Sequence, residues 1–251
     1  MNDEISGIEG LFRGFQIFYG VVVRLQEIVE KAAPSIIRGL ELFGDIALLL
    51  STMDSLAQAQ IVFTDDLTLE LAHRFRESSN IAEEVDTYYC ENNRLIQLID
   101  KIKNYDQLKE YTSFYQEIVT AQDQGHYQLA CIGLMALTDG VLADISEMQG
   151  CTNFQKRIAK IRGKLSDNVT LSQMDKKLLC VCIGLEKVCD TMFKGTPFTE
   201  AEADELNRNW LQHGRTHRTY TRLDFLKVLL LLDGIIFLSE QCQVPDTVED
   251  E

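Results

Sequence analysis

Apolar side chains recur at three- and four-residue steps along most of this chain, and this spacing limits its possible folds more than any other feature. In residues 5–31 the pattern runs from Ile8 to Val29, and Pro34 follows as a stop. A period near 3.6 residues collects apolar side chains on one face of a helix. Only 3 prolines and 15 glycines interrupt the 251 residues, so we expect an all-α protein folded as a helical bundle.

Polar and glycine-containing breaks divide the rest of the chain into further expected helices. Residues 61–66 should form a short extended link, and Thr64 or Asp65 is suited to cap the helix that follows. Gly125 and Gly150 are suited to end helices, because glycine tolerates the left-handed backbone found there. The expected helices cover residues 35–60, 67 to the polar break at 77–80, 81–103, 108–124, 126–148, 153–165, 171–193 and 221–241.

Two segments in the C-terminal half carry local predictions. Thr199 and Glu202 match a capping box, which predicts a helix from there to about His213, ended by Gly214. Residues 153–165 carry five basic side chains, which we interpret as the solvated face of a helix rather than a binding surface. These are Lys156, Arg157, Lys160, Arg162 and Lys164.

A polar stretch at residues 104–106 marks the expected division of the chain. We predict an N-terminal helical region over residues 1–106 and a helical domain over residues 107–243. An acidic tail, residues 244–251, follows Pro245 and is expected to be disordered. No internal repeat is visible.

The chain carries 39 acidic and 24 basic side chains, which gives a formal net charge of −15. A long groove that follows many phosphates needs a stripe of basic residues, and this composition argues against one. A small site for one scissile phosphate remains compatible with it.

The chain reads as a globular protein that stays where it is made. Its acidic N-terminus lacks the basic start and apolar run of a signal peptide, which predicts a cytoplasmic location. The longest apolar run, residues 225–238, is interrupted by Lys227 and Asp233 and is too short to cross a bilayer, so we expect a core helix and no membrane contact. Seven cysteines, mostly among apolar residues, predict buried reduced thiols.

One segment departs from the acidic character of the rest. Residues 207–223 hold four arginines and two histidines but no acidic residue, and Arg208 and His213 stand five residues apart. An arginine that keeps its charge and a histidine that titrates near neutrality are what phosphodiester cleavage needs. On a regular helix these side chains would point about 140° apart. They share a site only if the helix ends between them, and Gly214 is placed to end it.

A structural role also explains this pair from spacing alone. Arg208 would then cap helix carbonyls or pair with an acid such as Asp139, and His213 would be an end-of-helix residue. No other arginine in the chain is followed four to six residues later by a histidine.

The sequence of residues 207–214, Asn-Arg-Asn-Trp-Leu-Gln-His-Gly, resembles the R-x4-6-H signature of the HEPN superfamily. It is similar to the N-R-[HN]-x-[IL]-x-H-G form of bacterial abortive-infection-like members, in which a Tyr/Thr-containing turn and a leucine-rich helix follow, as here. Residues 126–130 and 137–142, with Asp139 before a glycine, are similar to the preceding helix of that family. The resemblance covers residues 108–243 and is weak before them.

The resemblance implies an all-α HEPN-like core that dimerises and joins two motifs into one metal-independent endoribonuclease site. Arg208 would hold the scissile phosphate, and His213 would exchange protons with the 2′-hydroxyl or the 5′-oxygen. Asn209 would orient His213. Asp139 would position Arg208 from the neighbouring helix, where the family more often has Glu.

Three basic residues beside the motif lie outside that signature: Arg215, His217 and Arg218 would guide RNA or simply be exposed. His213 and His217 have the i,i+4 spacing of helical zinc ligands. A glycine interrupts the helix between them and the two arginines would repel a cation, so we expect no metal there. The Cys-Val-Cys sequence at 180–182 lacks the spacing of a zinc knuckle.

The sequence therefore favours a cytoplasmic, homodimeric HEPN-like endoribonuclease that needs no cofactor and acts on RNA in prokaryotic defence, as an abortive-infection protein or a toxin. An antitoxin or another defence protein would be its partner. The alternative is a non-catalytic HEPN-like helical module that binds RNA, a nucleotide or a protein. A plain helical scaffold whose acidic surface meets a basic partner is the third possibility.

Overall fold

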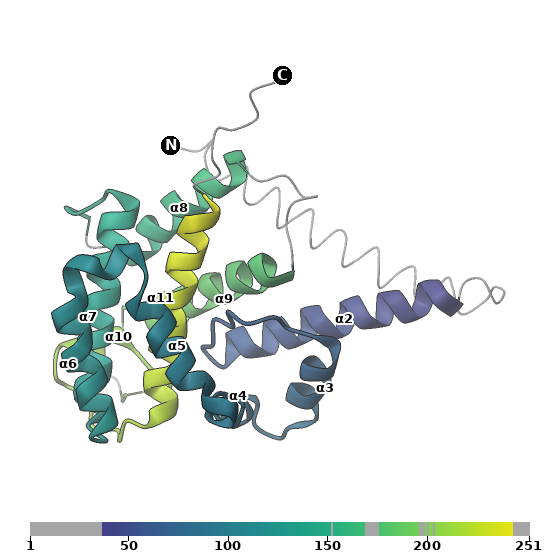
Figure 1. The fold of residues 1–251 in the computed structure, drawn as a ribbon, viewed down its shortest axis with the longest axis horizontal. Coiled ribbons are helices and arrows are strands. Elements are labelled where there is room, and N and C mark those ends of the chain that lie inside the picture. Colours follow the sequence, from purple (N-terminus) through teal and green to yellow (C-terminus); the bar gives the residue numbers. More distant parts are fainter. Residues whose placement is uncertain are drawn as a thin grey trace.

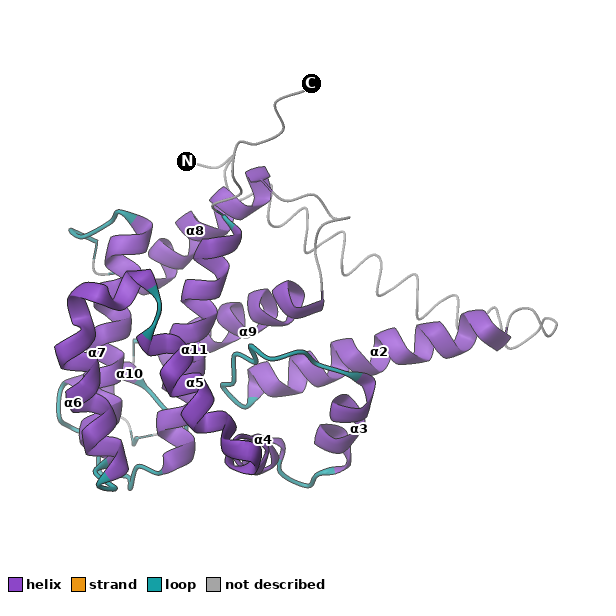
Figure 2. Ribbon diagram, in the orientation of Figure 1, coloured by secondary structure: helices purple, strands orange, loops and turns teal. Residues whose placement is uncertain are grey.

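The computed structural model describes residues 37–151, 153–168, 176–195, 199, 201–202 and 204–242. Within these residues every regular element is a helix and none is a strand, as Figure 2 shows. The all-α prediction is therefore confirmed. The helix expected over residues 5–31 and the acidic tail expected at residues 244–251 lie outside the described residues.

Within the described residues, loops and turns join successive helices (Figure 1). Two of the connections are 3-10 turns, Glu91–Asn93 and Asp106–Tyr111. The helices are α2 (Ile37–Gln58), α3 (Leu69–Glu77), α4 (Ile81–Cys90), α5 (Arg94–Lys103), α6 (Thr112–Asp123), α7 (Tyr127–Ser146), α8 (Phe154–Asn168), α9 (Lys176–Met192), α10 (Arg208–Gln212) and α11 (Arg222–Gln241).

Helices α7 and α11 form the centre of the fold. Helix α11 packs against α4, α5, α7, α8 and α9 (Figure 1). Its side chains from Phe225 to Leu238 are buried almost without exception. This confirms the prediction of a core helix over the longest apolar run. Helix α7 is long and apolar enough to cross a membrane by length and composition, yet it packs against α6, α8, α10 and α11. Its apolar surface is thereby largely covered by protein.

The extended link that follows α2 packs against α9 and α11. Ile61, Val62 and Phe63 are buried and have no regular structure, as the sequence predicts. A Cβ added to Gly234 on α11 would lie 2.5 Å from Val62 Cγ1, and one added to Gly184 on α9 would lie 3.0 Å from Val62 Cα. Glycine is needed at both positions because the link passes so close. One hydrophobic core extends across the expected division between residues 106 and 107.

The helix expected over residues 81–103 is interrupted, which corrects that prediction. Asn92 and Asn93 adopt left-handed backbone angles, with φ of 53° and 57°, and separate α4 from α5. Asparagine tolerates this conformation better than most residues, so two adjacent asparagines turn the chain where the apolar spacing alone indicates one helix.

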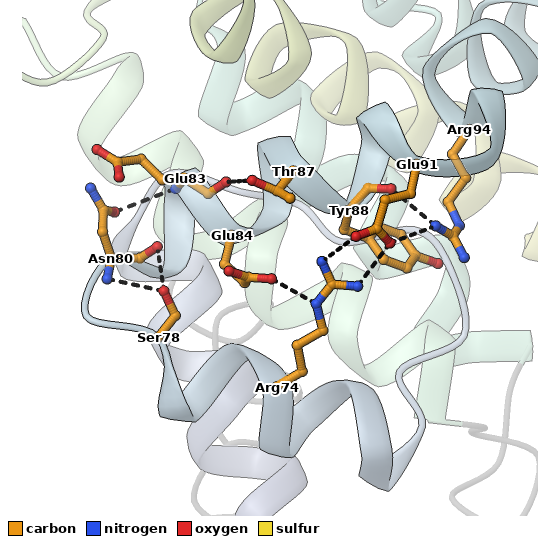
Figure 3. Close-up of polar contacts among 9 residues, drawn as sticks. All are labelled: Arg74, Ser78, Asn80, Glu83, Glu84, Thr87, Tyr88, Glu91 and Arg94. Atoms are coloured by element: carbon orange, nitrogen blue, oxygen red, sulfur yellow. Dashed lines mark hydrogen bonds and ion pairs between the residues drawn. The ribbon is translucent and has the colours of Figure 1, made fainter.

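A cluster of charged side chains stabilises this turn (Figure 3). Arg74 on α3 donates from Nε to Glu84 at 2.6 Å and from both terminal nitrogens to Glu91 at 2.9 and 2.8 Å. Arg94 donates to Glu91 at 3.3 Å, and its guanidinium lies 4.1 Å from the centre of the Tyr88 ring. The cluster joins α3, α4 and the start of α5, although its partial exposure makes each ion pair modest in energy.

Several predicted helix ends are shifted. Thr68, and not Thr64 or Asp65, caps α3, because its hydroxyl accepts from the Leu71 N–H at 3.1 Å. Helix α7 ends at a left-handed Glu147 with φ of 56°, and not at Gly150. The prediction for Gly125 is confirmed, since it follows α6 with φ of 77°.

The cysteines agree in part with the prediction of buried thiols. Cys131, Cys180, Cys182 and Cys189 are buried, and no described cysteine forms a disulfide. Burial raises the pKa of Cys182 to about 11 and that of Cys180 to about 12. Cys90 is exposed, against the expectation for the set.

Candidate functional site

The motif segment forms a short helix, α10, which begins at Arg208. The capping box predicted at Thr199 and Glu202 starts no helix in the described residues, since residues 201–202 and 204–207 are irregular. Asn207 caps α10 instead, because its Oδ1 accepts from the N–H groups of Asn209 at 2.9 Å and Trp210 at 3.4 Å. Arg208 is therefore the first residue of the helix.

The C-terminal end of α10 lies directly before the motif histidine. Gly214 has φ of 64° and donates its N–H to Leu211 O at 3.2 Å, and the Arg215 N–H donates to Trp210 O at 3.1 Å. This pair of bonds is the Schellman ending that a left-handed glycine supports. His213 is the C-cap residue and is exposed. The helix thus ends directly before His213, while the His213 N–H still donates to the Asn209 carbonyl as in a helix.

Arg208 contacts the acid that the sequence suggested. Its Nη2 donates to Asp139 Oδ2 on α7 at 3.1 Å. The Arg208 side chain is 24% exposed, and its Nε is buried without an acceptor among the described residues. The contact agrees with a positioning role for Asp139, and it equally agrees with the structural pairing considered above.

A second arginine binds the same carboxylate from the other side. Arg157 on α8 donates from Nη1 to Asp139 Oδ1 at 2.9 Å and to Asp139 O at 3.2 Å, and from Nε to Met148 O at 3.3 Å. Its side chain is only 6% exposed. Asp139 therefore lies between a buried arginine and a partly exposed one.

Arg157 corrects the interpretation of residues 153–165 as a solvated face. It lies on the apolar side of α8, where Phe154, Ile158 and Ile161 are also buried. The four buried positions, 154, 157, 158 and 161, have the spacing of residues on one face of a helix. That spacing is the sequence signal that distinguishes Arg157 from its basic neighbours.

Asn209 contacts His213 through the backbone, where its carbonyl accepts from the His213 N–H at 3.2 Å. This bond belongs to the helix itself and does not involve the asparagine amide. Orientation of the imidazole by that amide stays a prediction.

The three basic residues after the motif have different surroundings. Arg218 donates to Asp224 Oδ1 and to Asp204 O, each at 2.5 Å, and lies 5.0 Å from the centre of the Tyr220 ring. It is largely engaged in holding the turn before α11. Arg215 and His217 are exposed, and the His217 backbone N–H donates to Glu202 at 2.7 Å. Those two side chains are the ones on the surface beside His213.

A lysine on α11 adds to the positive charge near this turn. Burial lowers the pKa of Lys227, and the charges acting on it come from Asp224, Arg218 and Glu205. Tyr220 is buried beside the same turn, and burial raises the pKa of its hydroxyl. The described residues contain no group of three or more His, Cys, Asp or Glu side chains placed to hold a metal ion.

Comparisons with known proteins give no relative for this chain. No protein-family model, no curated protein and no solved structure matches it. The likeness to HEPN proteins therefore depends on the motif and its surroundings alone.

Proposed function

We propose that the protein is a metal-independent endoribonuclease of HEPN type, with Arg208 and His213 as its catalytic residues. The observation that carries the proposal is the short helix α10, which begins at Arg208 and ends directly before an exposed His213. Arg208 and His213 lie at opposite ends of this helix, and the left-handed Gly214 turns the chain directly after the exposed His213. A second copy of the motif in a dimer would complete the site.

In the proposed reaction, His213 and its counterpart in a second copy of the chain exchange protons at the scissile bond. The 2′-oxygen loses its proton and attacks phosphorus, the bond to the 5′-oxygen breaks, and that oxygen takes up a proton. The products are a 2′,3′-cyclic phosphate and a 5′-hydroxyl. Arg208 would stabilise the negative charge on the phosphoryl oxygens, and Asp139 would hold the guanidinium in place.

The wider setting belongs to the same proposal. We infer a cytoplasmic homodimer in which two motifs meet, and a role in prokaryotic defence as an abortive-infection protein or toxin with an antitoxin or defence partner. Growth arrest on expression of the chain, relieved in His213→Ala, is the expected sign of that role. Normal growth with the active enzyme would argue against it.

The decisive experiment is incubation of the purified protein with labelled RNA in excess EDTA. We expect wild-type protein to leave 2′,3′-cyclic phosphate ends, and Arg208→Ala and His213→Ala to lose cleavage by a factor on the order of 100 or more. His73→Ala and Arg76→Ala are matched controls, because both replace exposed residues on α3. Circular dichroism checks folding, and light scattering measures the oligomeric state.

A specific observation also favours the alternative, a non-catalytic helical module. Arg208 already donates to Asp139, so its guanidinium has a partner within the fold. In that case RNA or a nucleotide would bind and remain intact. Binding that depends on Arg208 and Arg215, without cleavage of any RNA tested, would select the module over the enzyme.

A further inference from the structure

The backbone before the motif helix is held by a side chain from the N-terminal half of the chain. Gln60 follows the end of α2 and is only 2% exposed. Its Oε1 accepts from the Leu206 N–H at 2.9 Å, and its Nε2 donates to the Leu206 carbonyl at 2.9 Å. The amide thus satisfies both backbone groups of a residue 146 positions away. Leu206 lies two residues before Arg208.

The end of α9 holds the same segment from another side. Gln60 Nε2 also donates to Thr191 Oγ1 at 3.3 Å, and Asn207 Nδ2 donates to the Lys194 carbonyl at 3.0 Å. Asn207 is the residue that caps α10. Contacts that fix Leu206 and Asn207 therefore also fix the point where α10 begins.

Helix α10 depends on these contacts because it spans only residues 208–212. A helix of this length is not stable by itself, and its position is set by what binds its ends. Leu206 is 1% exposed, so its N–H and carbonyl cannot turn to water if the Gln60 amide is removed.

The backbone of Gln60 supports a specific need for its side chain. Its φ is 61°, a left-handed conformation that glycine and asparagine adopt more easily than glutamine. A disfavoured conformation persists where the surrounding contacts require it. Here the contact is the double bond to Leu206.

We propose that Gln60 is a positioning residue for the candidate site: it couples the placement of α2 to α10, and so to Arg208 and His213. The catalytic consequence rests on the proposed ribonuclease function, whereas the positioning of α10 can be tested without RNA.

Trp210 provides the test, because it is the only tryptophan of the chain and lies buried within α10. In Gln60→Gly, which removes the amide and suits the left-handed backbone, we expect red-shifted Trp210 emission and stronger quenching by acrylamide, with an unchanged circular dichroism spectrum. Gln58→Ala is the matched control. Its amide is exposed and donates to Asp54 at 2.7 Å, so its emission should equal that of the wild type.

Gln60→Asn keeps the proposal testable if Gln60→Gly fails to fold. It retains an amide and a tolerant backbone but is one methylene too short to reach Leu206, so a smaller change of the same sign is expected. Unchanged Trp210 emission in the folded variants would overturn the proposal, even with a lower unfolding midpoint, because that result describes general stabilisation only.

RNA cleavage provides a second measurement for the same variants. A displaced Arg208 and His213 should lower kcat by a factor on the order of 100, with a smaller change in KM. Wild-type protein that cleaves no RNA would contradict the proposed function, and the fluorescence result would still decide the positioning role. Full kcat in a variant with altered emission would overturn the coupling to catalysis.

Discussion

Two carboxylates on the central helices, Asp139 on α7 and Asp233 on α11, are neutralised in different ways. Asp233 is completely buried and accepts from Lys101 Nζ at 2.8 Å and from the Tyr105 hydroxyl at 2.8 Å. Lys101 is the one cation paired with it among the described residues. The side chain of Asp139 is 27% exposed and is paired with two arginines.

The difference shows which of the two basic side chains can be removed at the lower cost in stability. Removal of Lys101 leaves a buried charge without a counterion, whereas removal of Arg208 leaves Asp139 still bound to the buried Arg157. A buried charge that loses its partner is strongly destabilising. Arg208 is therefore the cation whose loss should cost the fold less.

The largest effect on stability is expected for Lys101→Met. Asp233 is buried and would lose its counterion, while the Lys101 side chain is 40% exposed, so the free energy of unfolding should fall by about 3 kcal/mol, the lower end for a broken buried pair. Urea denaturation at neutral pH measures this. Lys103→Met, which replaces a lysine that is likewise exposed on the same helix but is not paired with Asp233, is the matched control and should change little. Equal stabilities for the two variants would contradict the account of Asp233.

A smaller effect is expected for Tyr105→Phe, which removes one hydrogen bond to the Asp233 carboxylate and should cost about 2 kcal/mol. Burial, and then the charge of Asp233, raise the pKa of the Tyr105 hydroxyl well above its ordinary range. Its contribution is therefore present below the unfolded pKa, about 10, and declines as pH rises above that value.

The loss of stability at alkaline pH distinguishes the contribution of the Tyr105 hydroxyl from a change in stability that is independent of pH. Denaturation in urea at a series of pH values should show a shallower loss of stability above about pH 10 in Tyr105→Phe than in the wild type. Parallel curves for the two proteins would argue that Tyr105 ionises equally in the folded and unfolded chains.

The smallest effect on stability is expected for Arg208→Met. Asp139 keeps Arg157, and a partly exposed ion pair contributes little, so the loss should stay below about 1 kcal/mol. The same variant should lose RNA cleavage if the proposed function is correct. A loss as large as that of Lys101→Met would make Arg208 a structural residue and favour the reading of the chain as a scaffold.

Much of the fold could be predicted from the sequence because helices carry a local signal. The apolar spacing indicates α2, α7, α9 and α11 where they occur. Gly125 and Gly214 indicate the turns after α6 and α10, because the left-handed backbone found there favours glycine. The division at Asn92 and Asn93 was missed because two exposed asparagines leave the apolar period intact. The α3 cap was missed because several hydroxyl and carboxyl side chains stand close together in residues 64–68.

The candidate site also contains residues that the sequence indicates and residues that it does not. Arg208 and His213 could be selected because they lie within one short segment, and the resemblance suggested Asp139 as a partner for Arg208. The sequence groups Arg157 with the solvated basic residues, since its burial depends on how α8 packs against α7. Gln60 carries no local signal, because its role comes from a contact 146 residues away.

The close passage of Val62 beside Gly184 and Gly234 has a consequence for how the chain is made. During synthesis the N-terminal residues leave the ribosome first. The link at residues 61–63 then has neither α9 nor α11 to cover it, and three fully apolar side chains remain in water. The link is covered only after α11 has emerged, so a helix late in the chain completes the packing of a segment that is synthesised much earlier.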